Sequence, residues 1–212
     1  MSARLKVESK GQVLCIGLNR REKYNAIDVE LYLALADPYG DLQRDDELRC
    51  GLLYGEGKHF CAGVELDKWG PHFANGSFPE LHPGACDPFG LDPVHRVAKP
   101  MVVAARGICF TAALELMLAA DVRVAADDAR FGQIEVKRGI YAVGGATIRF
   151  VQNIGWGSGR IEARTGLRMM PTFPRSALLA GRRVFPGTAR RLAYQAGLSQ
   201  HVDQFKPAPG IR

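Results

Sequence analysis

Short apolar runs rich in β-branched residues alternate along this chain with runs of helical periodicity, and this alternation is the feature that most constrains the fold. The expected strands are 5–8 and 13–18, joined as a hairpin at 9–11, then 48–54, 100–105 and 122–126. The expected helices are 25 to about 44, capped by Asn25 or Asp28, then 112–120 and 143–152. Residues 70–93 are rich in Gly, Pro and His and predict a loop or a loosely ordered insertion. Such alternation predicts an α/β fold.

The size and composition are those of one globular domain with a substantial core. The chain has 212 residues, of which 47% are apolar and 24% charged. No apolar run is long enough for a membrane span, and the N-terminus lacks the apolar stretch of a secretion signal. The cysteines are odd in number and scattered, which favours reduced thiols in a cytoplasmic protein over a metal site or disulfide framework. They are Cys15, Cys50, Cys61, Cys86 and Cys109.

The net charge of +6 is unevenly distributed. From Gly157 onward there are nine Arg, one Lys and two acids, a net of +8, while residues 1–156 hold 18 bases and 20 acids, a net of −2. A basic segment can bind polyanions. Because the body is mildly acidic, we do not expect a nucleic-acid partner for the domain as a whole.

The segment Ala112–Ala120 has a single polar side chain, Glu115. A helix that is apolar on all sides is normally buried, and a lone carboxylate in it is costly unless it is paired or used. A buried glutamate with a raised pKa suits a general acid or base near neutral pH. The alternatives are that Glu115 faces solvent or forms a structural ion pair.

Glu135 follows a turn and lies among mixed charges, so taken alone it is predicted to be a surface residue or a partner of Lys137 or Arg138. Two glycine-containing turns add to the pattern. Residues 61–63 are small enough for close approach of a ligand to the backbone, or form a simple strand-to-helix turn. Residues 106–112 run into the apolar helix, whose N-terminal amides suit a developing oxyanion.

These segments together resemble, in order and spacing from about Lys6 to Trp156, the enoyl-CoA hydratase (crotonase) superfamily. Residues 19–26 (NRREKYNA) are similar to its NRPEKxNA motif, 60–66 (FCAGVEL) to FCAGxDL, 99–107 (KPMVVAARG) to KPxIAAVNG, 115–121 (ELMLAAD) to ELALACD and 129–135 (ARFGQIE) to ARFGxPE. Each motif is loose alone, but five in order are specific. The resemblance implies the crotonase-like ββα spiral of the ClpP/crotonase fold for residues 1–156.

The resemblance also assigns roles to residues. The backbone amides of Val64 and Ala112 would form an oxyanion hole for an enolate-like intermediate, and Glu115 and Glu135 would be the catalytic acid–base pair. Coenzyme A would be held around Arg20, Lys23 and Ala26 and by backbone at Cys61 and Ala62. Where this chain has Thr111, Ala112 and Ala113 the family usually has glycines, so the methyl group of Ala112 is expected to crowd the thioester.

Two carboxylates favour hydration of a 2-enoyl-CoA, or its reverse, in fatty acid or lipid metabolism. Coenzyme A would then be part of the substrate, and neither a metal nor another cofactor is implied. A homotrimer or hexamer is implied as well. The alternatives are another crotonase activity, such as double-bond isomerase or thioester hydrolase, and a non-catalytic CoA-binding or assembly subunit whose basic tail contacts an acidic partner.

Residues 157–212 do not follow the family pattern and are assigned to a divergent basic C-terminal tail. They are rich in Arg and Pro and poor in acids, which predicts a shifted reading frame or an alternative terminus. The alternative is a genuine divergent tail with helices at Ser176–Arg183 and Thr188–Gly197.

Overall fold

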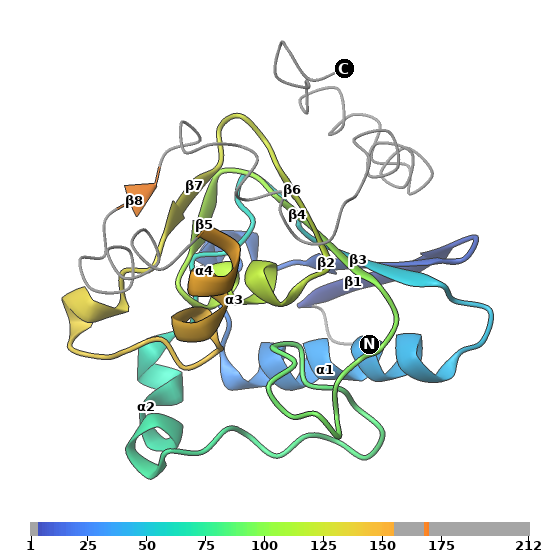
Figure 1. Ribbon diagram of the computed structural model, residues 1–212, viewed down its shortest axis with the longest axis horizontal. Coiled ribbons are helices and arrows are strands. Elements are labelled where there is room, and N and C mark those ends of the chain that lie inside the picture. Colours follow the sequence, from blue (N-terminus) through green and yellow to red (C-terminus); the bar gives the residue numbers. More distant parts are fainter. Residues whose placement is uncertain (1–3, 155–167, 170–212) are drawn as a thin grey trace.

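The computed structural model describes residues 4–154 and 168–169, and these form an α/β fold with two sheets (Figure 1). The five-stranded sheet has the order β1-β2-β3-β4-β6. Its strands are β1 (Leu5–Lys10), β2 (Val13–Leu18), β3 (Cys50–Gly55), β4 (Met101–Ala105) and β6 (Val122–Ala125). Only β1 and β2 are antiparallel; the other neighbours are parallel. The smaller sheet has the order β5-β7-β8, with β5 (Ile108–Phe110), β7 (Arg130–Gly132) and β8 (Arg168–Met169).

Four α-helices and two 3-10 turns are described with these sheets. They are α1 (Val29–Arg44), α2 (Leu66–Asn75), α3 (Ala112–Ala119) and α4 (Ala146–Ile154), with η1 (Arg21–Lys23) and η2 (Glu135–Arg138). In Figure 1, α1 runs below the five-stranded sheet, and α3 lies centrally, in contact with β4, β5 and α4. The apolar helix α3 is therefore enclosed between the two sheets and α4, as its composition predicts.

The predicted hairpin and the start of the first helix are confirmed. Leu5 pairs with Leu18 at one end of the β1–β2 ladder and Lys10 with Val13 at the turn. Asp28 is the N-cap of α1, and its carboxylate accepts a hydrogen bond from the Leu31 amide at 2.8 Å. The other candidate cap, Asn25, lies before the helix.

Asn25 has a different role, because its side-chain amide donates to the carbonyls of Glu56, His59 and Phe60 at 2.9–3.0 Å. These contacts tie the segment before α1 to the loop after β3. Asn25 is thereby held beside the residues that lead directly into the loop at 61–64.

The prediction of a loop over residues 70–93 is wrong in its first part, because α2 continues to Asn75. Trp69, buried on this helix, stacks on Phe73 and donates its indole N–H to the Ile27 carbonyl at 2.9 Å. This packing outweighs Pro71, which removes one helical hydrogen bond. Gly76, with φ 62°, then ends the helix in the left-handed conformation.

Two further boundaries differ from the prediction. The segment 106–112 contains the short strand β5 as well as a turn, and three residues show too little alternation to be recognised as a strand. The last predicted helix starts at Ala146, not Val143. Residues 144 and 145 are both glycines, and Gly145 has φ 100°, which is incompatible with a helix.

The segment assigned to the tail is described only at β8, which pairs antiparallel with β7. The helices predicted at Ser176–Arg183 and Thr188–Gly197 lie outside the described residues. Within the described part of the chain, all five cysteines are buried and free, no helix has the length and apolarity that crossing a membrane requires, and no cluster of candidate metal ligands occurs.

Candidate active site

Glu115 lies on the first turn of α3 and is 2% exposed. Its Oε1 accepts a hydrogen bond from the Ala146 amide at 3.0 Å, at the start of α4. Burial raises the pKa of Glu115 to about 7, although the amides of Ala146 and Gly144 and the charge of Arg149 act against the rise. Glu115 is therefore buried and does not face solvent. Among the described residues it also has no ion-pair partner within salt-bridge distance. The carboxyl group can exchange a proton near neutral pH.

Glu135 is also buried, at 7% exposed, so the prediction of a surface residue or an ion pair with Lys137 or Arg138 is wrong. It stands at the start of η2, which turns its side chain inward and leaves the two basic residues exposed. Burial, with a smaller contribution from the charge of Glu115, raises the pKa of Glu135 to about 7. The two carboxyl groups are therefore close enough to affect each other's ionisation.

Gln133 orients Glu135 by donating from Nε2 to Oε1 at 2.6 Å. The other carboxyl oxygen of Glu135 is buried, and no described residue hydrogen-bonds to it. A buried carboxylate oxygen is normally satisfied, so this one points to a group supplied from outside the protein, such as water or substrate.

Both glutamates line one small cavity, together with Val64 and Ala112 from the two turns. Its volume is about 20 Å³, which is room for about one water molecule. The other walls are mainly apolar and come from α2, the loop that follows it and the segment 140–144. The sequence-predicted acid–base and backbone residues are thus brought together around one small cavity.

The amides of Val64 and Ala112 have no acceptor among the described residues. The loops that carry them are held in register, since the Cys61 amide donates to the Ile108 carbonyl at 3.0 Å and the Phe110 amide to the Cys61 carbonyl at 3.2 Å. Two free N–H groups beside a cavity, one on a fixed loop and one at the start of α3, suit the binding of a developing negative charge.

Arg20, assigned to coenzyme A by resemblance, is only 8% exposed. Its guanidinium forms ion pairs with Glu65 at 2.9 Å and Asp28 at 3.2 Å and donates to the Ala26 carbonyl at 2.5 Å. It therefore holds the half-buried Ala26 and the rest of this segment against the starts of α1 and α2.

Lys23 is more accessible, with 58% of its side chain exposed and its ammonium 3.4 Å from Glu65. The Ala62 amide donates to the Tyr24 carbonyl at 3.0 Å, whereas Cys61 is fully buried. The structure thus places the segment 20–26 beside the loop 61–64, so the five residues assigned to coenzyme A lie in one neighbourhood, with Lys23 the accessible cation among them.

Several side chains at the cavity were not predicted. Thr111, Trp69 and Tyr141 line it, and Gln133 supports it from behind Glu135. The sequence carried a signal for Thr111 only, as a departure from the glycines expected there.

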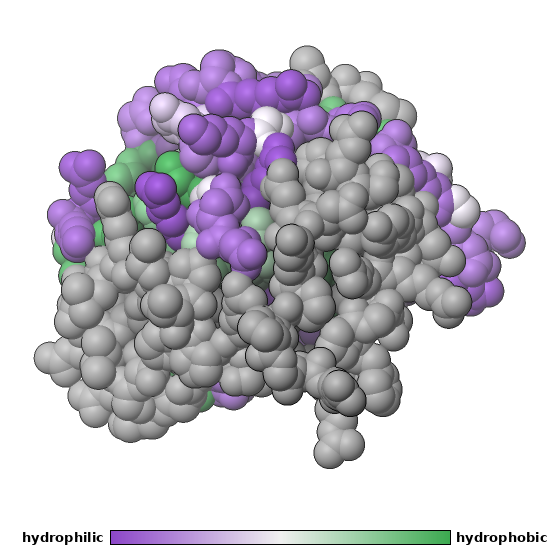
Figure 2. All heavy atoms as spheres, turned by 90° about the horizontal axis from the view of Figure 1, so that it is seen from above, coloured by the Kyte–Doolittle hydropathy of each residue, from purple (hydrophilic) through white to green (hydrophobic). Residues whose placement is uncertain are grey.

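Seen from above, the described surface is mainly hydrophilic, with apolar side chains gathered toward the end that carries η2 in Figure 1 (Figure 2). Tyr141, just after η2, is 76% exposed.

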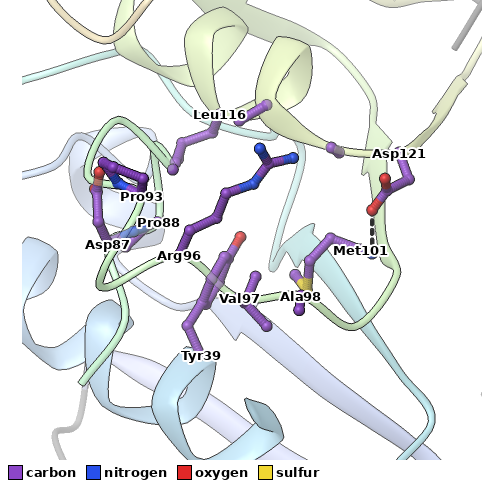
Figure 3. A pocket seen from close by; sticks show the side chains of 13 residues that line it. Tyr39, Asp87, Pro88, Pro93, Arg96, Val97, Ala98, Met101, Leu116 and Asp121 are labelled. Carbon is purple, nitrogen blue, oxygen red and sulfur yellow. Dashed lines mark hydrogen bonds between the residues drawn. The ribbon is translucent and has the colours of Figure 1, made fainter. Parts of the chain in front are cut away.

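A larger cavity, of about 380 Å³, lies elsewhere and includes neither glutamate. It is formed by the loop 87–98 and the end of α3. Figure 3 shows Arg96 reaching across it toward Leu116, with Tyr39 and Asp87 at its sides. Because the two glutamates with raised pKa values line only the smaller of these two cavities, we assign the chemistry to that one.

The crotonase-like fold is recognised by a parallel-rich sheet, a smaller second sheet and a buried helix that brings a carboxylate close to two free backbone amides. The chain belongs to the enoyl-CoA hydratase/isomerase family, whose model matches residues 8–171. This match extends past Trp156, where the recognised motifs end.

Curated relatives agree with this assignment. The chain is 40% identical over 148 residues to a mevalonyl-coenzyme A hydratase of Beauveria bassiana, covering 68% of this chain and 53% of the relative. It is 30% identical over 151 residues to enoyl-CoA hydratase EchA19 of Mycobacterium tuberculosis (70% and 56%). It is 31% identical over 162 residues to a mitochondrial Delta(3,5)-Delta(2,4)-dienoyl-CoA isomerase of Dictyostelium discoideum (73% and 54%). The chain therefore spans about half the length of the curated relatives it matches.

The fold is shared with solved structures. A probable enoyl-CoA hydratase/isomerase from Mycobacterium abscessus superposes with a TM-score of 0.81 at 34% identity, covering 94% of this chain and 76% of the other. An enoyl-CoA hydratase from Mycobacterium tuberculosis gives 0.73 at 30% identity, covering 95% and 76%.

Proposed function

We propose that this chain catalyses the reversible addition of water to a 2-enoyl-CoA thioester. The observation that carries the proposal is the pair of buried glutamates, Glu115 and Glu135, on one water-sized cavity, each with a pKa raised to about 7. Hydration needs one group to take a proton from water and another to give one to carbon. Two carboxyl groups that share protons near neutral pH can do both.

In the proposed reaction the thioester oxygen accepts hydrogen bonds from the amides of Val64 and Ala112. One glutamate takes a proton from the bound water, whose oxygen attacks the β-carbon. The electron pair of the double bond moves toward the thioester and gives an enolate-like intermediate, whose charge the two amides stabilise. The other glutamate protonates the α-carbon. Removing one such amide donor costs roughly 100- to 1000-fold in rate in comparable enzymes.

The acyl group would lie against the aromatic wall of the cavity, which includes Trp69, Phe73, Phe78 and Phe89. The small volume and these rings favour a short or planar acyl group, because a long chain would require the wall to move. Coenzyme A would lie along the segment 20–26 and the loop 61–64, with Lys23 supplying an accessible positive charge. The proposal includes no metal and no cofactor apart from the coenzyme A of the substrate, and a homo-oligomer stays part of it.

The test is loss of the enoyl-thioester absorbance of crotonyl-CoA and of a longer 2-enoyl-CoA, for wild type, Glu115→Gln and Glu135→Gln. We expect each Gln variant to lose at least about 100-fold in kcat, because proton transfer by a positioned group contributes roughly 100- to 10,000-fold. Glu47→Gln, at an exposed position, is the matched control and should behave as wild type. Hydration at the wild-type rate in both site variants would refute the proposal.

Two other outcomes point to different functions. A 31% identical relative is a dienoyl-CoA isomerase, so a double-bond shift without water addition would assign this chain to isomerisation. Binding of CoA without turnover of either substrate would indicate a binding or assembly subunit.

A further inference from the structure

Thr111 stands at the junction of β5 and α3 in a backbone conformation that a β-branched residue rarely adopts, with φ 54° and ψ −124°. Its backbone is fixed on both sides. Its amide donates to the Gly132 carbonyl at 2.8 Å, and its carbonyl accepts from the amides of Leu114 and Glu115 at 2.8 and 3.1 Å. Strain of this kind persists only where the surroundings enforce it, and it is concentrated at active sites and ligand clamps.

The Thr111 hydroxyl lies beside both peptide groups that carry the free amides. Ala112 follows Thr111 directly in the chain. On the opposite loop, a Cβ added to Gly63 would overlap the Thr111 Oγ1, so the hydroxyl is packed against the residue that precedes Val64. Thr111 also lines the small cavity with Val64, Ala112 and Glu115.

No described residue hydrogen-bonds to this hydroxyl, and it does not cap α3. A hydroxyl group can always rotate its proton toward an acceptor, and the acceptor expected between the Val64 and Ala112 amides is an oxygen that becomes negatively charged. Glu135, which lines the same cavity with an unpartnered carboxyl oxygen, is independent evidence that a ligand enters it.

We propose that the Thr111 hydroxyl donates a third hydrogen bond to the thioester oxygen, alongside the amides of Val64 and Ala112. This inference rests on the function proposed above. Hydrogen bonds to charged groups are stronger than neutral ones, so the hydroxyl contributes mainly once the enolate charge has formed. Its loss should lower kcat by about 10- to 100-fold and change KM little.

The experiment uses the full 212-residue chain with three substitutions at this position. Thr111→Val keeps the shape but removes the hydroxyl, and should lose kcat with crotonyl-CoA as above. Thr111→Ser keeps the hydroxyl and should stay within about 3-fold of wild type, since rotamer freedom is its main change. Thr111→Gly removes both the hydroxyl and the strain, and should unfold at a higher temperature while losing kcat. A merely structural role predicts that activity follows stability instead.

A second readout does not need turnover. Acetoacetyl-CoA has an acidic α-carbon, and its enolate absorbs in the near ultraviolet. The oxyanion donors should stabilise the bound enolate, so Thr111→Val should raise the pKa of bound acetoacetyl-CoA by about one to two units, the same 10- to 100-fold change. Thr111→Ser should not.

The outcomes separate the two proposals. The third hydrogen bond would be supported if Thr111→Val and Thr111→Gly lose kcat and raise the enolate pKa, while Thr111→Ser keeps a kcat and an enolate pKa close to wild type. Wild-type values in Thr111→Val, in an enzyme that Glu115→Gln inactivates, would overturn the role of Thr111 and leave the hydratase function intact. A wild-type chain that neither hydrates crotonyl-CoA nor binds acetoacetyl-CoA would overturn both.

Discussion

Glu115→Gln should make the protein more stable above pH 7 while it removes activity. Burial raises the folded-state pKa of Glu115 from about 4.5 to about 7. Between these two pH values the folded protein keeps a proton that the unfolded chain has released, so the stability contributed by Glu115 is complete below about pH 4.5 and is lost as pH rises to 7. A rise of about 2.5 units corresponds to about 3 kcal/mol at pH 8.

Glutamine cannot ionise, yet its side-chain oxygen can still accept the hydrogen bond from the Ala146 amide. The variant should therefore gain up to about 3 kcal/mol at pH 8 and almost nothing at pH 4.5. For a chain of this size that is a rise in Tm of roughly 6–12 °C. A gain in unfolding free energy that appears at pH 8 but not at pH 4.5 is due to removal of the ionised carboxylate.

The assay is thermal or urea unfolding of wild type, Glu115→Gln and Glu47→Gln across pH 4.5 to 8. Glu47 is exposed, so its variant should reproduce the wild-type curve. If Glu115→Gln shows the same pH dependence as wild type, Glu115 does not titrate near 7 in the folded protein, and the acid–base argument loses its basis.

Three further changes test the surroundings of the site. Gly63→Ala should abolish activity and lower Tm, because its Cβ would overlap the Thr111 hydroxyl at a φ of 99°; activity assays on the folded fraction check this. Asp28→Ala removes the cap of α1, worth about 0.5–2 kcal/mol, and a carboxylate partner of Arg4 and Arg20, so urea unfolding should show a loss at or above the upper end of that range. Gln133→Leu removes a donor that lowers the pKa of Glu135, so this pKa should rise and the pH–rate profile should move to higher pH.

The scaffold could be predicted from the sequence because its elements are locally encoded. The hairpin has β-rich strands on both sides of a glycine turn, and the β3, β4 and β6 segments are apolar runs closed by turn residues. The α2 helix was not predicted, because it depends on the packing of Trp69 and Phe73 and because Pro71 argues against a helix. Strand β5 is too short to carry a pattern of its own.

The site was harder to predict, since burial is a property of the assembled chain. Glu115 could be suspected because its own helix is apolar. Nothing near Glu135 in the sequence indicates burial, because α3 and Gln133 enclose it only after folding. Only the resemblance placed Glu135 beside Glu115. Thr111 has a backbone conformation that its residue type disfavours, and the two glutamates are buried although carboxylates prefer solvent. Such conflicts between local preference and structure are expected at functional sites.

The coupling of the two glutamates gives a last and separable test. The charge of Glu115 raises the pKa of Glu135. Above pH 7 the folded protein is therefore destabilised by the burial of each of the two carboxylates and by the repulsion between them. Glu115→Gln and Glu135→Gln each remove one burial cost and the whole repulsion, whereas the double variant removes the repulsion only once. The double variant should therefore gain less stability at pH 8 than the sum of the single variants, by the size of the repulsion. At pH 4.5 both carboxyls are protonated in the folded protein, and the same cycle should be additive. Additivity at both pH values would mean that the two groups do not interact, and would remove the shared-proton basis of the proposed hydration.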